Sequence, residues 1–144
     1  MSEAILRQAV RADAPGIWRV RYAVTENTLT PGRIGDEELL EHLERIGRGW
    51  VVEEDGEIVA FAIGRTTDAN IWGLFVDPAA QGRGHGARLH DVMVEWMFAQ
   101  GLETLWLGTG NETRARAFYE KHGWREAGPY GERETRYELT RSRA

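Results

Sequence analysis

Three alternating glycines near the middle of the chain have the spacing that phosphate chemistry requires. Gly82, Gly84 and Gly86 follow Gln81 and precede Ala87 in the segment QGRGHGA, between a short apolar run and a longer amphipathic one. Glycine lets the backbone approach a ligand closely because it has no Cβ atom. The first turn of a helix offers unpaired N–H groups and the positive end of the helix dipole. Together these features predict a phosphate-binding loop.

Two familiar phosphate loops fit this segment poorly. A Walker A loop ends in Lys-Ser or Lys-Thr, and the only lysine of the chain, Lys121, is followed by neither residue. The dinucleotide fingerprint is formally met by the first two glycines and Ala87. That class of site, however, needs an acidic residue at the end of the next strand, which here reads Gly-Thr-Gly at residues 108–110. The first motif is therefore excluded and the second is disfavoured.

A third motif accounts for this segment and for a second one downstream. LFVDPAAQGRGHGA, residues 74–87, resembles motif A of the GNAT superfamily of N-acetyltransferases: Gln or Arg, two residues, Gly, one residue, then Gly or Ala. RAFYEKHGW, residues 116–124, resembles the helix that follows in that family, with its tyrosine, short basic stretch and Gly-aromatic end. The close resemblance covers about residues 70–128, and the upstream half agrees in the order of its elements.

The resemblance implies that the chain binds acetyl-CoA. In the family, backbone N–H groups of the glycine loop hold the pyrophosphate, and the edge of the preceding strand pairs with the pantetheine arm. The chain has no cysteine, which excludes a cysteine nucleophile, so the reactive sulfur has to come with the cofactor. Arg83 is expected beside the phosphates, with a solvated surface position as the alternative. The cofactor-binding residues that the resemblance implies are Leu74, Phe75, Val76, Gln81, Gly82, Arg83, Gly84, His85, Gly86, Ala87 and Asn111.

Asn111 departs by one position from the family pattern. Family members commonly carry Asn seven residues before the tyrosine, and Glu112 stands there in this chain. Either the turn GTGNET contains an extra residue and Asn111 still reaches the cofactor, or that contact is lost. In the second case, Asn111 or Thr113 simply caps the next helix.

Tyr119 is the candidate general acid. In the family the amine attacks the thioester directly, a backbone N–H stabilises the oxyanion, and a tyrosine that corresponds to Tyr119 protonates the leaving thiolate. The alternative is an ordinary core aromatic residue beside Phe118. The base that deprotonates the amine stays open among Glu26, Glu53, Glu54 and water.

The acceptor amine is expected opposite the cofactor, against the segment of residues 24–35. Glu26, Asn27 and Trp72 are the candidate substrate-binding residues. The sequence does not identify the amine itself.

The histidines outside the glycine loop show no metal-ligand spacing. His42, His90 and His122 lie far apart in the sequence and are expected to face solvent, so no metal site is predicted. His85 lies inside the loop, where its backbone is expected to matter more than its ring.

These residues require an alternating α/β framework. Apolar periodicities and turn residues predict the order β-α-α-β-β-β-α-β-α-β-β, a single three-layer mixed-sheet domain over residues 1–144. Asp55-Gly56 predicts a tight hairpin. The helix after the glycines is expected from Arg88 to Gly101, and Asp13 is expected to cap an earlier helix.

Composition restricts the possible partners. The chain has 144 residues, a formal net charge of −5 and scattered basic residues, which argues against nucleic acid as a partner. No apolar run approaches the ~18 residues of a membrane span and no signal peptide is visible, so we expect a cytoplasmic location. The terminal strands and the six tryptophans favour a homodimer.

The function predicted on these grounds is transfer of the acetyl group of acetyl-CoA to a primary amine of a small molecule or peptide. The alternative is a non-catalytic acyl-CoA binding or regulatory module of the same fold.

Overall fold

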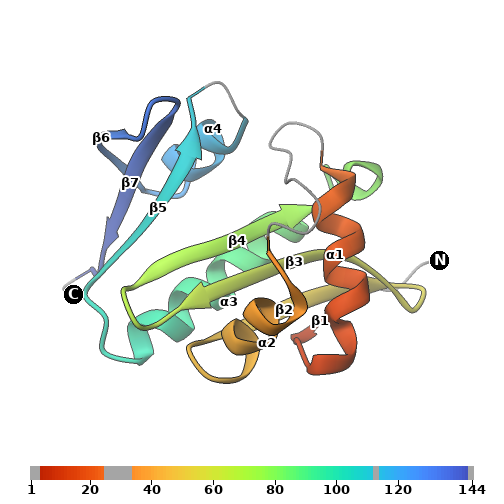
Figure 1. Cartoon of the computed structure of the whole chain (residues 1–144). Helices are drawn as coiled ribbons and strands as arrows, with labels where there is room; N and C mark the ends of the chain where they lie inside the picture. Colours follow the sequence, from red (N-terminus) through yellow and green to blue (C-terminus); the bar gives the residue numbers. More distant parts are fainter. Residues whose placement is uncertain (1–3, 25–33, 112–113, 143–144) are drawn as a thin grey trace.

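The structure, a computed structural model, describes residues 4–24, 34–111 and 114–142. Within these residues, seven strands form one mixed sheet that helices cover on both faces (Figure 1). The strands are β1 (Ala4–Gln8), β2 (Gly47–Glu54), β3 (Glu57–Arg65), β4 (Asn70–Val76), β5 (Thr104–Gly110), β6 (Arg125–Tyr130) and β7 (Glu134–Thr140). The helices are α1 (Ala14–Ala23), α2 (Asp36–Glu44), α3 (His85–Ala99) and α4 (Arg114–Lys121), with 3-10 turns η1 (Arg11–Asp13) and η2 (Pro78–Ala80).

The order of these elements is the one predicted from the sequence, and the three-layer α/β architecture is confirmed. The strands lie in the order β1-β2-β3-β4-β5-β7-β6, with β4 and β5 parallel and the other neighbours antiparallel. The predicted hairpin between β2 and β3 is also confirmed. Asp55 and Gly56 have φ of 52° and 79°, as a two-residue turn between twisted strands requires.

Two apolar clusters, one on each face of the sheet, make up the core. On one face, α1 and α2 pack Ile17 and Leu39 against Val51 and Ile63 of β2 and β3. On the other face, α3 and α4 pack against the alternate residues of the same strands; this cluster includes Val52, Ala60, Ala62, Leu89, Met93, Met97, Leu105, Leu107, Tyr119 and Tyr137. Because both faces of β2 and β3 are covered, these strands read as nearly continuous apolar runs. None of the described helices is long and apolar enough to cross a membrane.

The start of α3 differs from the sequence prediction. The helix begins at His85 rather than Arg88, so the last glycine of the loop already belongs to its first turn. Its end was predicted correctly, because Gly101 has φ of +93° just beyond the last helical turn. The earlier start brings the first N–H groups of the helix into the glycine loop itself.

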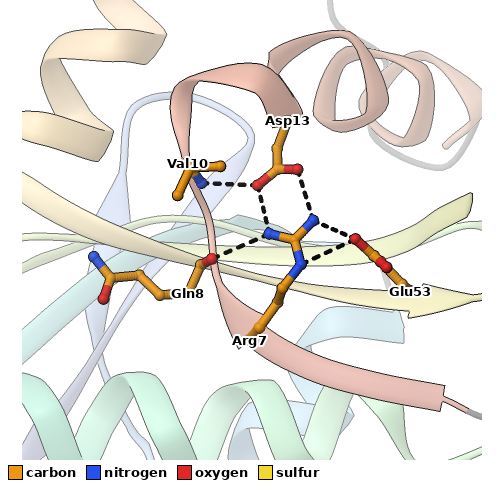
Figure 2. Close-up of polar contacts among 5 residues, drawn as sticks. All are labelled: Arg7, Gln8, Val10, Asp13 and Glu53. Carbon is orange, nitrogen blue, oxygen red and sulfur yellow. Dashed lines mark hydrogen bonds and ion pairs between the residues drawn. The ribbon is translucent and has the colours of Figure 1, made fainter. Parts of the chain in front are cut away.

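Asp13 does not cap α1 with its side chain, contrary to the prediction. Its carboxylate instead accepts hydrogen bonds from the N–H of Val10 at 2.7 Å and from both terminal nitrogens of Arg7, each at 2.8 Å (Figure 2). Arg7 also binds the carboxylate of Glu53 in β2. This cluster of Arg7, Asp13 and Glu53, the N-terminal ion cluster, joins β1, β2 and the start of α1.

Candidate active site

β4 and β5 pair at one end only. Their parallel pairing is confined to Asn70 and Trp106, and beyond this point the strands diverge (Figure 1). β4 keeps its antiparallel pairing with β3 up to Val76. Over residues 71–76 the other edge of β4 therefore has no partner strand among the described residues. Backbone groups along that edge are available to an extended ligand.

The glycine loop leads from η2 into α3. Gly82 and Gly84 both have φ of +82°, a conformation that residues with a side chain rarely adopt. A Cβ atom at either position would meet no other atom within 4 Å, so the loop is open on this side. Gly84 occupies the N-cap position of the 15-residue helix α3 and offers no side-chain cap. The N–H groups of the first turn, at the positive end of the helix dipole, therefore remain available to an anion.

A cavity of about 420 Å³, the loop-side cavity, lies between the open end of β4, the glycine loop and α4. It contains every residue predicted to bind the cofactor except Arg83 and Asn111. Its lining consists of Val24, Leu74, Phe75, Val76, Ala80, Gln81, Gly82, Gly84, His85, Gly86, Ala87, Thr109, Arg114, Ala115, Phe118, Tyr119, Lys121 and His122.

A second cavity of about 370 Å³, the helix-side cavity, lies between α1, α2 and the other side of β4 and β5. Trp72, predicted to contact the acceptor, is in its lining, whereas Glu26 and Asn27 lie outside the described residues. The described lining is mostly apolar and includes two charged residues, Arg21 and Glu134. Its members are Ile17, Trp18, Arg21, Ile34, Leu39, Phe61, Ile63, Ile71, Trp72, Gly73, Leu74, Phe75, Leu107, Gly108, Thr109, Ala115, Tyr119 and Glu134.

The two cavities meet where β4 and β5 diverge. Leu74, Phe75, Thr109, Ala115 and Tyr119 line both of them. Ligands that fill the two cavities at the same time would therefore both contact these five residues.

Tyr119 is the one of these five with an acidic proton. It is 6% exposed, and its ring packs edge-on against Trp124 with a centroid distance of 5.5 Å. Burial raises the pKa of the Tyr119 hydroxyl well above its usual value of 10, because the phenolate would be poorly solvated. No hydrogen bond joins this hydroxyl to another described residue, and since no buried side-chain polar atom of the described residues lacks a partner, the hydroxyl oxygen is not fully enclosed. A protonated donor thus lies between the two cavities.

Asn111 lies at the end of β5 and lines neither cavity. The hydroxyl of Thr135 in β7 donates a hydrogen bond to its side-chain oxygen, and its backbone N–H donates to the carbonyl of Arg133 at 3.0 Å. In this arrangement the side chain ties β5 to β7. Glu112 and Thr113 lie outside the described residues, so capping of α4 by Thr113 stays a prediction.

Two of the carboxylates considered as general bases, Glu53 and Glu54, are engaged elsewhere, and the third, Glu26, lies outside the described residues. Glu53 belongs to the N-terminal ion cluster. Glu54 binds Arg83 and His85 on the sheet side of the glycine loop, and neither glutamate lines a cavity.

The expectation that the histidines face solvent was wrong for His42 and His90, which are buried. His42 stacks on Trp72 with a centroid distance of 3.7 Å and thereby supports a wall of the helix-side cavity. His90 lies close to Asp91 and His122, with the potential ligand atoms of the three within 4.8 Å of one another. Sequence spacing missed these neighbours because α3 and α4 bring the two histidines together.

The hydrogen bonds of His90 argue against a metal at this cluster. Its Nε2 accepts from the indole N–H of Trp124 at 2.9 Å, and its Nδ1 lies 2.9 Å from a carboxylate oxygen of Asp91. A metal on Nδ1 would require a proton on Nε2, where Trp124 already donates. Burial also lowers the pKa of His90, so the neutral, hydrogen-bonded ring is favoured.

Several cavity residues on α4 were not singled out from the sequence. Arg114 and Lys121 bring positive charge to the loop-side cavity, and Arg114 also donates a hydrogen bond to the side chain of Gln81 at 2.6 Å. Phe118 approaches Gly86 of the loop. Their spacing on one amphipathic helix was the available signal, but it does not distinguish a core face from a cavity wall.

Comparisons with known proteins agree with this geometry. The sequence profile described as the Acetyltransferase (GNAT) family matches residues 12–124. A ribosomal-protein alanine N-acetyltransferase of Haemophilus ducreyi is 34% identical over 76 residues, which make up 51% of this chain and 52% of that protein. A mycothiol acetyltransferase of Beutenbergia cavernae is 38% identical over 81 residues, 52% of this chain and 27% of that protein. The matches thus span about half the length of the first relative and less of the second.

Among solved structures, the PaiA N-acetyltransferase of Thermoplasma acidophilum in complex with coenzyme A has a similar fold. It has a TM-score of 0.79 and 16% sequence identity, and the match covers 96% of this chain and 99% of that one. The family profile covers most of the chain, including the glycine loop and Tyr119. This chain therefore belongs to the acetyltransferase (GNAT) family.

Proposed function

We propose that this chain transfers an acetyl group from acetyl-CoA to a primary amine of a small molecule or peptide, by direct attack of the amine on the thioester. The observation that carries the proposal is the meeting of the two cavities at Tyr119. A site of this shape can hold two substrates at once, with a proton donor between them.

The loop-side cavity suits acetyl-CoA. First-turn N–H groups of α3, together with Arg114 and Lys121, offer positive charge to the pyrophosphate. The free edge of β4 at Leu74, Phe75 and Val76 can pair with the amide groups of the pantetheine arm. Bound acetyl-CoA would supply an activated acyl group and a sulfur that the chain itself does not have.

The helix-side cavity suits the acceptor. Its wall of Trp18, Trp72 and Phe75 offers apolar surface, while Arg21 and Glu134 provide one charge of each sign. When the amine nitrogen bonds to the acyl carbon, the carbon–sulfur bond breaks and Tyr119 gives its proton to the departing sulfur. The amine loses its own proton to water or to a base. Neither Glu53 nor Glu54 is placed to be that base.

The names of the relatives support an amine acceptor but do not agree on one. One is called a ribosomal-protein alanine N-acetyltransferase and another a mycothiol acetyltransferase. A test panel should therefore contain peptides with a free N-terminal alanine, amino sugars and simple arylalkyl and polyamines. A cytoplasmic location and a homodimer stay predictions from the sequence.

Two measurements test the proposal in order. Calorimetry with CoA and acetyl-CoA should show saturable binding at one site per chain; no binding of either would refute it. Incubation with acetyl-CoA and each amine should then release free thiol in proportion to acetylated amine. Binding without acceptor-dependent thiol release would favour the non-catalytic acyl-CoA binding module instead.

A further inference from the structure

Glu54, the last residue of β2, lies beside the glycine loop. Its side chain is 12% exposed and lines neither cavity. No reacting group is near enough in the proposed mechanism to give it a direct chemical role. Within the described residues, its side chain binds Arg83 of the glycine loop and His85 at the start of α3.

The two oxygens of this carboxylate bind the residues on either side of Gly84. Arg83 donates from Nη1 to Oε1 at 2.5 Å, and His85 lies with Nε2 3.3 Å from Oε2. Gly84 itself, at φ of +82°, is the most conformationally permissive residue of the three. Glu54 thus holds the residues before and after Gly84, the glycine whose positive φ lets the loop turn.

His85 is held from its other side as well. Its side chain is 3% exposed, and Arg88 lies with Nη2 2.9 Å from His85 Nδ1. Arginine can only donate, so Nδ1 accepts and the proton on Nε2 points to Glu54. The ring thereby links the carboxylate to the first turn of α3. The His85 ring thus has contacts in the loop that the sequence did not predict.

The same contacts change the expected role of Arg83. Its guanidinium is paired with Glu54 and does not line the loop-side cavity. The ion pair with Arg83 neutralises the negative charge of Glu54, which lies beside the proposed pyrophosphate site. The pKa of Glu54 is lowered, first by Arg83 and then by His85, so the carboxylate stays ionised at neutral pH.

We infer that Glu54 is a positioning residue that holds the glycine loop, through Arg83 and His85, in the conformation that binds the pyrophosphate of acetyl-CoA. The inference rests on the proposed function. A loop with three glycines has many conformations available, and ordering them on binding would weaken affinity. The Glu54 carboxylate orders the loop before the ligand binds, so less conformational entropy is lost on binding.

The test compares a ligand that has the pyrophosphate with one that does not. Glu54→Gln removes the negative charge that holds Arg83 and His85, and we expect the Kd for CoA and the KM for acetyl-CoA to rise about tenfold. The kcat at saturating acetyl-CoA should stay close to that of the wild type. With S-acetylpantetheine, which has no pyrophosphate, KM should be unchanged by the substitution.

Glu53→Gln is the matched control, because it makes the same change one residue earlier. Glu53 binds Arg7 in the N-terminal ion cluster, so this variant should lose thermal stability and keep its affinity for CoA. A loss of affinity in Glu54→Gln that is equal for acetyl-CoA and S-acetylpantetheine would overturn the inference, as would unchanged CoA affinity. If the wild type itself does not bind CoA, the proposed function fails first.

A double-mutant cycle separates this role from direct phosphate binding by Arg83. If Arg83 acts only through Glu54, then Arg83→Gln weakens CoA binding by no more than Glu54→Gln does, because the contact between Glu54 and His85 remains, and the double variant is no weaker than Glu54→Gln alone. If Arg83 contacts the phosphate itself, the two losses multiply, and the inference is wrong. The melting temperature of each variant checks that it is folded before its affinity is used in the cycle.

Discussion

At the scale of single residues, the position of Tyr119 decides between a core aromatic and a general acid. The ring packs like a core residue, yet the hydroxyl lies between two cavities and has no partner among the described residues. A purely structural tyrosine would be expected to hydrogen-bond its hydroxyl when buried. Tyr137 shows this behaviour, since it donates to Glu120 at 2.7 Å and accepts from Arg116 at 3.1 Å.

We expect Tyr119→Phe to lower kcat about 100-fold, a typical loss for a general acid, and to leave the Kd for acetyl-CoA nearly unchanged. Because burial raises the pKa of Tyr119, the wild-type hydroxyl stays protonated and the ratio of the two rates should be constant from about pH 7 to 9. Tyr137→Phe is the control, with lower stability and normal kcat. An unchanged kcat in Tyr119→Phe would identify it as a packing residue.

Gly84 offers a second test at this scale. Gly84→Glu places a negative charge and a side chain where phosphate is expected, and we predict that calorimetry will detect no saturable binding of CoA. Gly101→Glu is matched to it, since Gly101 also has positive φ, at +93°, and open space around its Cβ position. Both variants carry similar backbone strain. Equal loss of CoA binding in the two would mean that strain, and not the phosphate site, is responsible.

At the scale of elements, the sequence predicted what periodicity and turn chemistry determine. The strands, their order and the Asp55-Gly56 hairpin follow from local patterns, and the structure has them. The start of α3 was missed because a glycine-rich segment has low helix propensity, although its backbone already turns helically at His85. The burial of His90 was missed because its partner Trp124 comes from beyond the next helix. Such contacts depend on packing between elements that no single window of sequence contains.

The same dependence on packing between elements explains which residues of the candidate site could not be predicted from the sequence. Motif resemblance pointed to the glycine loop, and the expected place of the acceptor pointed to Trp72; both line cavities in the structure. The sequence suggested Glu54 only as a possible general base and did not predict its contact with the loop, which arises because β2 ends beside the loop. The contribution of Arg114 and Lys121 to the loop-side cavity likewise depends on how α4 packs against β5.

The N-terminal ion cluster leads to a prediction about the join between β1, β2 and α1. The pKa of Asp13 is lowered, chiefly by Arg7, so its ionised form stabilises the fold above the unfolded pKa of about 3.9, and this contribution is lost as pH falls through the folded value. Asp13→Asn should lower the free energy of unfolding at pH 7 by about 2 kcal/mol. Near pH 3 the difference in the free energy of unfolding between Asp13→Asn and the wild type should be smaller.

Urea denaturation at the two pH values measures this. Glu44→Gln is the control, because its ion pair with Arg11 lies on the surface and should contribute little at either pH. A difference between Asp13→Asn and the wild type that does not change with pH would show that the carboxylate contributes by packing alone.

At the scale of the whole molecule, β4 and β5 diverge within the sheet, and the two cavities share lining residues at this divergence. The loop-side cavity takes helical residues from α3 and α4, and the helix-side cavity takes them from α1 and α2 and, at Ala115 and Tyr119, from α4. A substitution in one cavity should then affect one substrate only. Trp72→Ala should change KM for the amine and leave the Kd for CoA unchanged, whereas Phe118→Ala should weaken CoA binding; the reverse pattern would exchange the two assignments.

This arrangement also predicts the kinetic mechanism. Both substrates can be bound together, and a chain without cysteine has no thiol to carry the acetyl group between two half-reactions. Initial rates measured against acetyl-CoA at several fixed amine concentrations should therefore give intersecting double-reciprocal lines. Parallel lines, or a burst of free CoA in the absence of amine, would indicate a covalent acetyl-enzyme. A side chain of the protein would then carry the acetyl group, and the direct-attack mechanism would be wrong.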